Sequence, residues 1–133
     1  MPFPVYLSLG RACLLLDRLD EARKLGNRVV ESFVSQPGFV ADALHLLGDI
    51  ASHPDRFDTE TAEANYCKAL ALAEPRGMRP LVAHCHLGLG TLYAEIGRVE
   101  PARAELAAAI ALYHAMEMMF WLPQAEAALA QVR

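Results

Sequence analysis

The residues best spaced for chemistry are two acids and two histidines on one expected helix. They are Asp42, His45, Asp49 and His53, which lie three, four and four residues apart. This spacing places them on one stripe of a helix, where carboxylates and imidazoles can hold a divalent metal. It also suits a solvated polar face with favourable charge pairs, and Pro54 is expected to fray the helix at His53. We expect the polar face and no metal site.

A second candidate for metal binding is the run His84-Cys85-His86. Residues two apart on a helix point about 200° away from each other. The two histidines therefore cannot bind one ion unless the helix is distorted. We predict no metal site here, and no cofactor elsewhere in the chain.

The sequence lacks a pattern typical of catalysis or phosphate binding. Gly88-Leu89-Gly90-Thr91 has neither the preceding strand nor the Gly-Lys-Ser/Thr ending of a phosphate-binding loop, so helix packing explains its glycines better. No serine has a histidine and an acid in an arrangement that suggests a nucleophile. We therefore predict no enzymatic activity for this chain. The serines considered are Ser8, Ser32, Ser35 and Ser52.

Helical hairpins are the elements that would position these side chains. From Leu81 to Tyr113 the apolar residues have helical period on both sides of a turn at Gly97-Arg98. Gly90 lies inside the first apolar face, where a missing side chain lets a second helix approach closely. The faces consist of Leu89, Leu92, Tyr93 and Ile96, followed by Ala102, Leu106, Ala109, Ile110 and Tyr113.

Earlier parts of the chain repeat this hairpin. The pair Leu89-Gly90 has counterparts at Leu47-Gly48 and Leu9-Gly10, with spacings of 42 and 38 residues. Asp17 occupies the left-handed turn position of Gly97. We expect units at about 3–36, 37–77 and 78–116, and a capping helix at about 120–132 that covers the last apolar face. Further helix signals are Pro37 and Pro80 at helix starts and Asp58 as an N-cap.

The hairpin resembles the tetratricopeptide repeat (TPR) in Leu89-Gly90, Tyr93, Gly97 and Ala102. The resemblance implies an all-α single domain over residues 1–133, a right-handed α-solenoid that binds a peptide or protein segment in a concave groove. First helices of successive units line that groove, which would be polar, slightly acidic and rich in histidine. The residues that the resemblance places there are Leu7, Arg11, Asp42, His45, Asp49, His84, Thr91 and Glu95.

A longer stretch, roughly Ala73 to Glu126, resembles the carboxy-terminal TPR tail of large bacterial signalling proteins. In those proteins an adenylate or guanylate cyclase domain and an AAA-type ATPase module precede the repeats. This implies an alternative function, in which the chain is a regulatory tail and its ligand is another domain of the same polypeptide. Pro123 departs from the charged residue expected at its position. The matching residues are Gly77-Met78-Arg79-Pro80, His84-Cys85-His86, Leu87-Gly88-Leu89-Gly90 and Phe120-Trp121-Leu122.

Composition indicates a folded protein with no nucleic-acid or membrane partner. Of 133 residues 54% are hydrophobic and 21% are charged, unlike a disordered chain. The net charge of −4 comes without a Lys/Arg cluster that could follow a phosphate backbone. The sequence shows no signal peptide or long apolar run, so we expect a cytoplasmic location. Cys13, Cys67 and Cys85 are expected to be reduced packing residues.

Two apolar stretches lie at the ends of the predicted row. Near the carboxy end, Met116, Met118, Met119, Phe120 and Trp121 either pack between the last hairpin and its cap or form a surface for a partner. At the amino end no polar helix precedes the first hairpin. We expect exposed apolar surface there, and either self-association through the first hairpin or a neighbouring segment upstream. That surface comprises Pro2-Phe3-Pro4-Val5-Tyr6-Leu7, Leu14, Leu15 and Leu16.

Overall fold

A computed structural model describes the backbone of residues 3–132 and the side chains of residues 8–132. Within this range the protein is all-α, as predicted, and contains no strand. None of the described helices is long and apolar enough to cross a membrane. The helices are α1 (Phe3–Leu15), α2 (Leu19–Ser32), α3 (Pro37–Ala51), α4 (Thr59–Ala73), α5 (Arg79–Glu95), α6 (Val99–Ala115) and α7 (Leu122–Ala130), and a short 3-10 turn, η1 (Pro54–Arg56), precedes α4.

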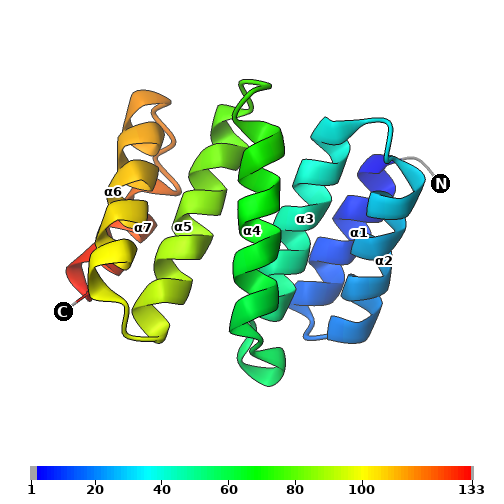
Figure 1. The fold of residues 1–133 in the computed structure, drawn as a ribbon, viewed down its shortest axis with the longest axis horizontal. Coiled ribbons are helices and arrows are strands. Elements are labelled where there is room, and N and C mark those ends of the chain that lie inside the picture. The colour runs from blue at the N-terminus through cyan, green and yellow to red at the C-terminus, as the bar shows by residue number, and fades with distance from the viewer. Residues whose placement is uncertain (1–2, 133) are drawn as a thin grey trace.

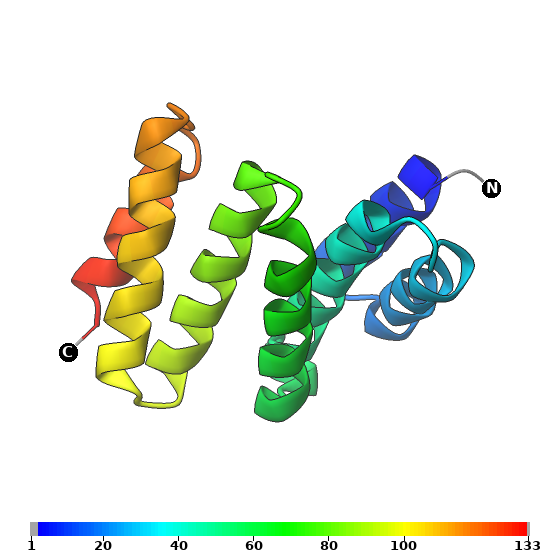
Figure 2. The same cartoon turned by 45° about the horizontal axis from the view of Figure 1, so that its top comes forward.

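Consecutive helices lie side by side and form a row (Figure 1). The pairs α1–α2, α3–α4 and α5–α6 are hairpins, and α7 packs on α6 at the end of the row. Contacts also join α1 to α3 and α3 to α5, so these three helices form one layer. The two chain ends lie at opposite ends of the row in Figure 2 as well. The right-handed superhelix of TPR proteins stays a prediction.

Four helices end with the same hydrogen-bond pattern. After α1, α4, α5 and α6 one residue has a left-handed backbone, at Asp17, Gly77, Gly97 and Glu117 (φ 59°, 67°, 80° and 54°). The next N–H donates to the carbonyl five residues earlier, which satisfies an otherwise unpaired group at the helix end. The left-handed turn expected at Asp17 is confirmed, whereas no pattern in the sequence indicated the one at Glu117.

The predicted helix starts are confirmed. Pro37 begins α3, and Pro80 lies in the first turn of α5, where a missing N–H leaves no hydrogen bond unmade. Asp58 caps α4 and accepts a hydrogen bond of 3.2 Å from the backbone N–H of Thr61. His53 lies beyond the end of α3, as expected from the neighbouring proline.

Small residues allow the helices to approach closely. A Cβ atom added to Gly90 would lie 2.6 Å from Cγ of Leu106 on α6, so the close-approach role expected for this glycine is confirmed. Fully buried alanines also allow close approach at other helix contacts, because a methyl group is small enough for two helix axes to lie close together. They include Ala22, Ala41, Ala62, Ala83, Ala102 and Ala109.

Some residues expected to pack are exposed instead. Leu9 of the first Leu-Gly pair is exposed, because α1 is the end of the row and has neighbours on one side only. Leu16, by contrast, was expected in the exposed apolar surface of the amino end and is 69% exposed, since α1 already ends at Leu15. Cys85 is buried as expected, but Cys67 lies on the solvent-facing side of α4 and is exposed.

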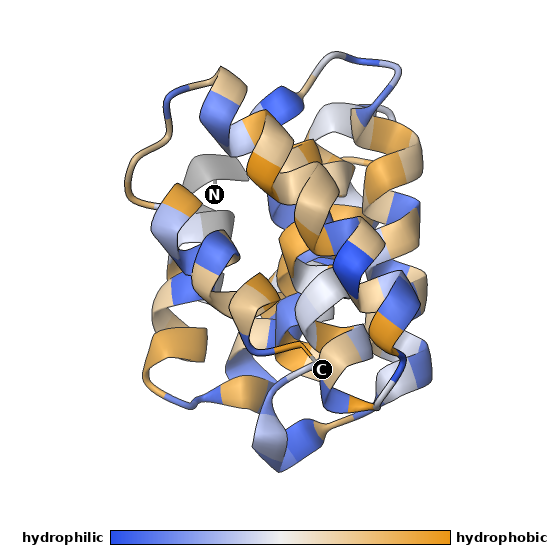
Figure 3. Cartoon of the chain, turned by 90° about the vertical axis from the view of Figure 1, so that its left-hand side faces the viewer, coloured by the Kyte–Doolittle hydropathy of each residue, from blue (hydrophilic) through white to orange (hydrophobic). Residues whose placement is uncertain are grey.

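The two ends of the row differ. At the carboxy end α7 places Ala125 against Tyr113, and Met116, Met118 and Trp121 pack around them. Phe120 is 73% exposed, and Met119 is exposed as well, so the cluster of methionines and aromatics divides between packing and surface. Figure 3 views this end and shows polar residues interspersed with apolar ones.

At the amino end Leu15 is 84% exposed, and Val34 on the loop between α2 and α3 is exposed too. The side chains of residues 2–7 lie outside the described residues. This hairpin therefore carries exposed apolar side chains, but self-association through it stays a prediction.

Replacing Gly90 with alanine tests the close packing of α5 on α6. The new methyl group would overlap Leu106, so the free energy of unfolding is expected to fall by about 1–3 kcal/mol in urea denaturation. The control is Gly38→Ala, whose Cβ would meet only the Met78 side chain at 3.6 Å and should not destabilise the protein. Equal stability of the two variants would show that α5 and α6 can separate without cost.

Candidate functional site

An open cavity of about 820 Å³, here called the groove, lies along α1, α3 and α5. Tyr66 reaches it from α4, and Trp121 borders it just before α7. Seven of the eight residues that the TPR resemblance placed in a groove line this one cavity. The side chain of the eighth, Leu7, lies outside the described residues. Binding of a ligand in this cavity stays a prediction. The seven are Arg11, Asp42, His45, Asp49, His84, Thr91 and Glu95.

The ring of Tyr66 passes from α4 to the groove between two glycines. A Cβ atom at Gly48 on α3 would lie 2.7 Å from the ring, and one at Gly88 on α5 would lie 2.6 Å from it. The side chain is only 2% exposed, and its hydroxyl donates a hydrogen bond of 2.6 Å to Oδ1 of Asp49. Burial, with a smaller contribution from Asp49, raises the pKa of Tyr66 far above its ordinary value.

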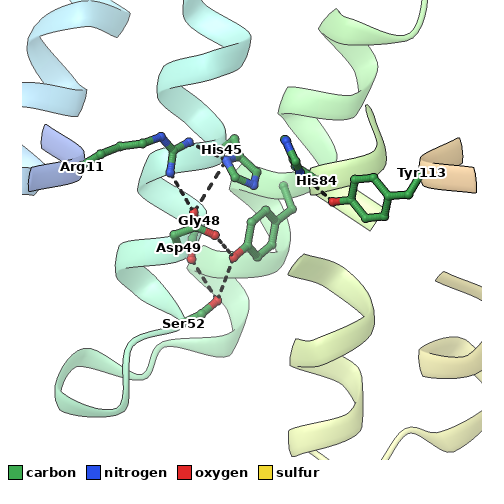
Figure 4. Close-up of polar contacts among 8 residues, drawn as sticks. Arg11, His45, Gly48, Asp49, Ser52, His84 and Tyr113 are labelled. Atoms are coloured by element: carbon green, nitrogen blue, oxygen red, sulfur yellow. Dashed lines mark hydrogen bonds and ion pairs between the residues drawn. The ribbon is translucent and has the colours of Figure 1, made fainter. Parts of the chain in front are cut away.

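Arg11 connects α1 to α3 (Figure 4). Its Nη1 donates to Oδ2 of Asp49 at 3.2 Å, and its Nη2 lies 2.8 Å from Nδ1 of His45. A guanidinium can only donate hydrogen bonds, so Nδ1 of His45 accepts and its proton is on Nε2. His45 is thus neutral, in agreement with the burial that lowers its pKa.

His84 belongs to an aromatic group at the α5–α6 side of the groove. Its Nδ1 and the hydroxyl of Tyr113 are 2.6 Å apart, and its ring centroid is 4.6 Å from that of Trp121. Burial, with smaller contributions from nearby His45 and Arg11, lowers the pKa of His84 to about 4. His84 is therefore uncharged at neutral pH.

The polar stripe on α3 is less solvated than expected. All four of its members line the groove, but His45 is only 7% exposed because Arg11 and Tyr66 pack beside it. The fourth member, His53, pairs with a residue outside the stripe: its Nε2 lies 2.9 Å from Oδ1 of Asp17. Among residues 8–132 no group of three or more His, Cys, Asp or Glu side chains could hold a metal ion.

Ser52 is connected to Asp49 only through the hydroxyl of Tyr66. Its hydroxyl is 3.3 Å from the hydroxyl of Tyr66, which donates to Asp49. However, Ser52 donates its own proton to the carbonyl of Gly48 at 2.9 Å, so no base withdraws it. This geometry orients Ser52 and does not activate it as a nucleophile.

Sequence reasoning missed Tyr66, Trp121 and Ser52 as members of the groove. The helical period predicts Tyr66 on an apolar face, and its side chain is buried. Because a tyrosine side chain is long, however, the hydroxyl reaches Asp49 in the other helix layer. The available signal was the pair of glycines, Gly48 and Gly88, because each one removes a side chain from a different helix at the same ring.

The groove is acidic overall. Among the described residues that line it, Asp42, Asp49 and Glu95 are acids, Arg11 is the only Lys or Arg, and His45 and His84 are neutral. Comparison of the chain with protein families, with characterised proteins and with solved structures gave no match. The interpretation of the groove therefore rests on its geometry and charge.

Removing the hydroxyl of Tyr66 tests the link between the layers. In Tyr66→Phe the partly buried carboxylate of Asp49 loses a donor, and the free energy of unfolding should fall by about 1–3 kcal/mol. Tyr93→Phe is the control, because its hydroxyl donates to the more exposed Glu63 and should cost less than about 1 kcal/mol. Urea denaturation of both variants measures the difference, and equal losses would contradict a special role for Tyr66.

The two histidines make stability depend on pH. Their pKa values are lowered in the folded protein, so below about pH 6.5 the unfolded chain binds protons that the folded chain does not. Stability is then full above pH 7 and falls as the pH drops toward 5. One such proton gives a slope of about 1.4 kcal/mol per pH unit, and less for His84, which is partly exposed.

The measurement is the urea midpoint of the parent and of His45→Gln/His84→Gln between pH 7.5 and 5. The double variant should lose less stability over this range. Asp42 has the opposite effect on the pH dependence of stability, in the parent and in the variant alike, because burial raises its pKa in the folded protein. Parallel curves for parent and variant would show that these histidines do not cause the dependence.

Proposed function

We propose that this chain is a non-catalytic binding module, an α-solenoid of TPR-like hairpins that holds an extended peptide or protein segment in the groove. The observation that supports this most strongly is one open cavity along α1, α3 and α5 that contains seven predicted groove residues. A separate protein and another domain of a longer polypeptide, as in the regulatory-tail hypothesis, would both supply such a segment.

The shape of the groove favours a chain segment as its occupant. Its lining residues on α5 run from Pro80 to Glu95. At 1.5 Å per residue these fifteen steps give about 22 Å, which an extended chain covers in six or seven residues. The groove is also open to solvent, so a bound segment can enter and leave it.

The chemistry of the groove favours binding over catalysis. Two of the hydroxyl groups that line it already donate their protons, Tyr66 to Asp49 and Ser52 to Gly48. Arg11 is held by two hydrogen bonds and orients its neighbours. Fixed polar groups between apolar walls are what a recognition site needs to orient a ligand.

Filling the groove tests this proposal. Peptides selected from a displayed library on the immobilised protein are labelled, and their affinity is measured by fluorescence anisotropy. Thr91→Trp places a large side chain on an exposed groove position and should weaken binding at least tenfold. Ala64→Trp, on the exposed side of α4 away from the groove, should leave affinity unchanged. Failure to select any peptide, or equal affinity for the two variants, would contradict the proposal.

A further inference from the structure

The acids of the groove are unequally neutralised. Asp49 accepts hydrogen bonds from Arg11 and Tyr66. Asp42 and Glu95 line the same cavity, but neither has an ion pair or hydrogen bond with a described residue. The one guanidinium of the groove is thus committed to Asp49, and two carboxylates remain available to an occupant.

Asp42 is the more informative of the two because it is partly buried. Loss of solvent raises its pKa, and Arg11 opposes this only from beyond ion-pair distance. A carboxylate that has lost part of its hydration without a partner is disfavoured until a cation meets it.

The surroundings of Asp42 suit a long basic side chain. Met78 and Leu81 line the groove just before and at the start of α5 and would pack against the methylene groups of a lysine or arginine. Trp121 also borders the groove beside His84, and an indole is the aromatic ring that attracts cations best.

Glu95 marks the opposite end of the groove. Helices α3 and α5 run in the same direction (Figure 1), and the rings of His45 and His84, with centroids 6.0 Å apart, set their relative register. Asp42 lies three residues before His45, and Glu95 lies eleven residues after His84. Along the helices the two acids are therefore about 21 Å apart, which is about six residues of extended chain.

We propose, building on the proposed function, that the groove selects an extended segment with two basic side chains about six residues apart. One of them pairs with Asp42, and the other pairs with Glu95. An even separation places both side chains on the same side of an extended chain. Between them the walls at Leu14, Leu87 and Leu92 favour apolar residues.

The test uses the selected peptides and isosteric removal of charge. Asp42→Asn should weaken binding about tenfold or more, and Glu95→Gln a few-fold because that acid is more exposed. Glu60→Gln removes an exposed acid of α4 outside the groove and should have no effect. Asp42→Asn should melt no lower than the parent, because it removes a partly buried charge without a partner.

A double-mutant cycle locates the contact. Each basic residue of the peptide is replaced by norleucine, which keeps the apolar stem and removes the charge. The norleucine change that weakens binding to the parent should have little further effect on Asp42→Asn. Asp42→Lys should then prefer a peptide with glutamate at that position.

Each result separates this inference from the proposed function. Selected peptides without basic residues, or basic peptides that bind Asp42→Asn and Glu95→Gln as well as the parent, would overturn the inference and leave groove binding intact. Loss of all peptide binding, or binding that Thr91→Trp does not weaken, would overturn both.

Discussion

The arrangement of the groove depends on one side chain, Tyr66, which crosses from one helix layer to the other. It can do so because Gly48 and Gly88 leave space for its ring on α3 and α5. Its hydroxyl meets Asp49, and Asp49 in turn binds Arg11 of α1. A residue of α4 therefore connects the three helices that line the groove. Since the ring is buried, water competes little for this hydrogen bond.

The same connection decides the charges that an occupant meets. Because Asp49 holds the guanidinium of Arg11, that cation also contacts His45 and keeps its imidazole neutral. Burial is the main cause that lowers the pKa of both histidines, and His84 is buried beside Trp121 and Tyr113. The groove is thus acidic because Arg11 is paired with Asp49 within the protein, whereas Asp42 has no ion pair or hydrogen bond with a described residue. A charge held in this way costs some stability, which a matching ligand would restore.

Local features were predictable from the sequence because neighbouring residues determine them. Prolines at helix starts, the cap at Asp58 and the turn at Asp17 are all set within a few residues. The positions lining the groove followed from helical period combined with the TPR resemblance. The role of Tyr66 was not predictable in this way, since it depends on glycines 18 residues before it and 22 residues after it. Exposure of Leu9 depends on which helix ends the row, and apolar periodicity contains no such information.

The cap of the row is also a wall of the groove. Trp121 stacks with Tyr113 and contacts His84, so the segment that leads into α7 both covers the last hairpin and borders the cavity. On the α1 side Leu15 borders the groove and is largely exposed. A bound segment would therefore be confined on the Trp121 side, while on the α1 side it could cover Leu15. Burying that leucine would add favourable apolar contact, so a ligand of the groove would also protect the most exposed apolar residue on its edge.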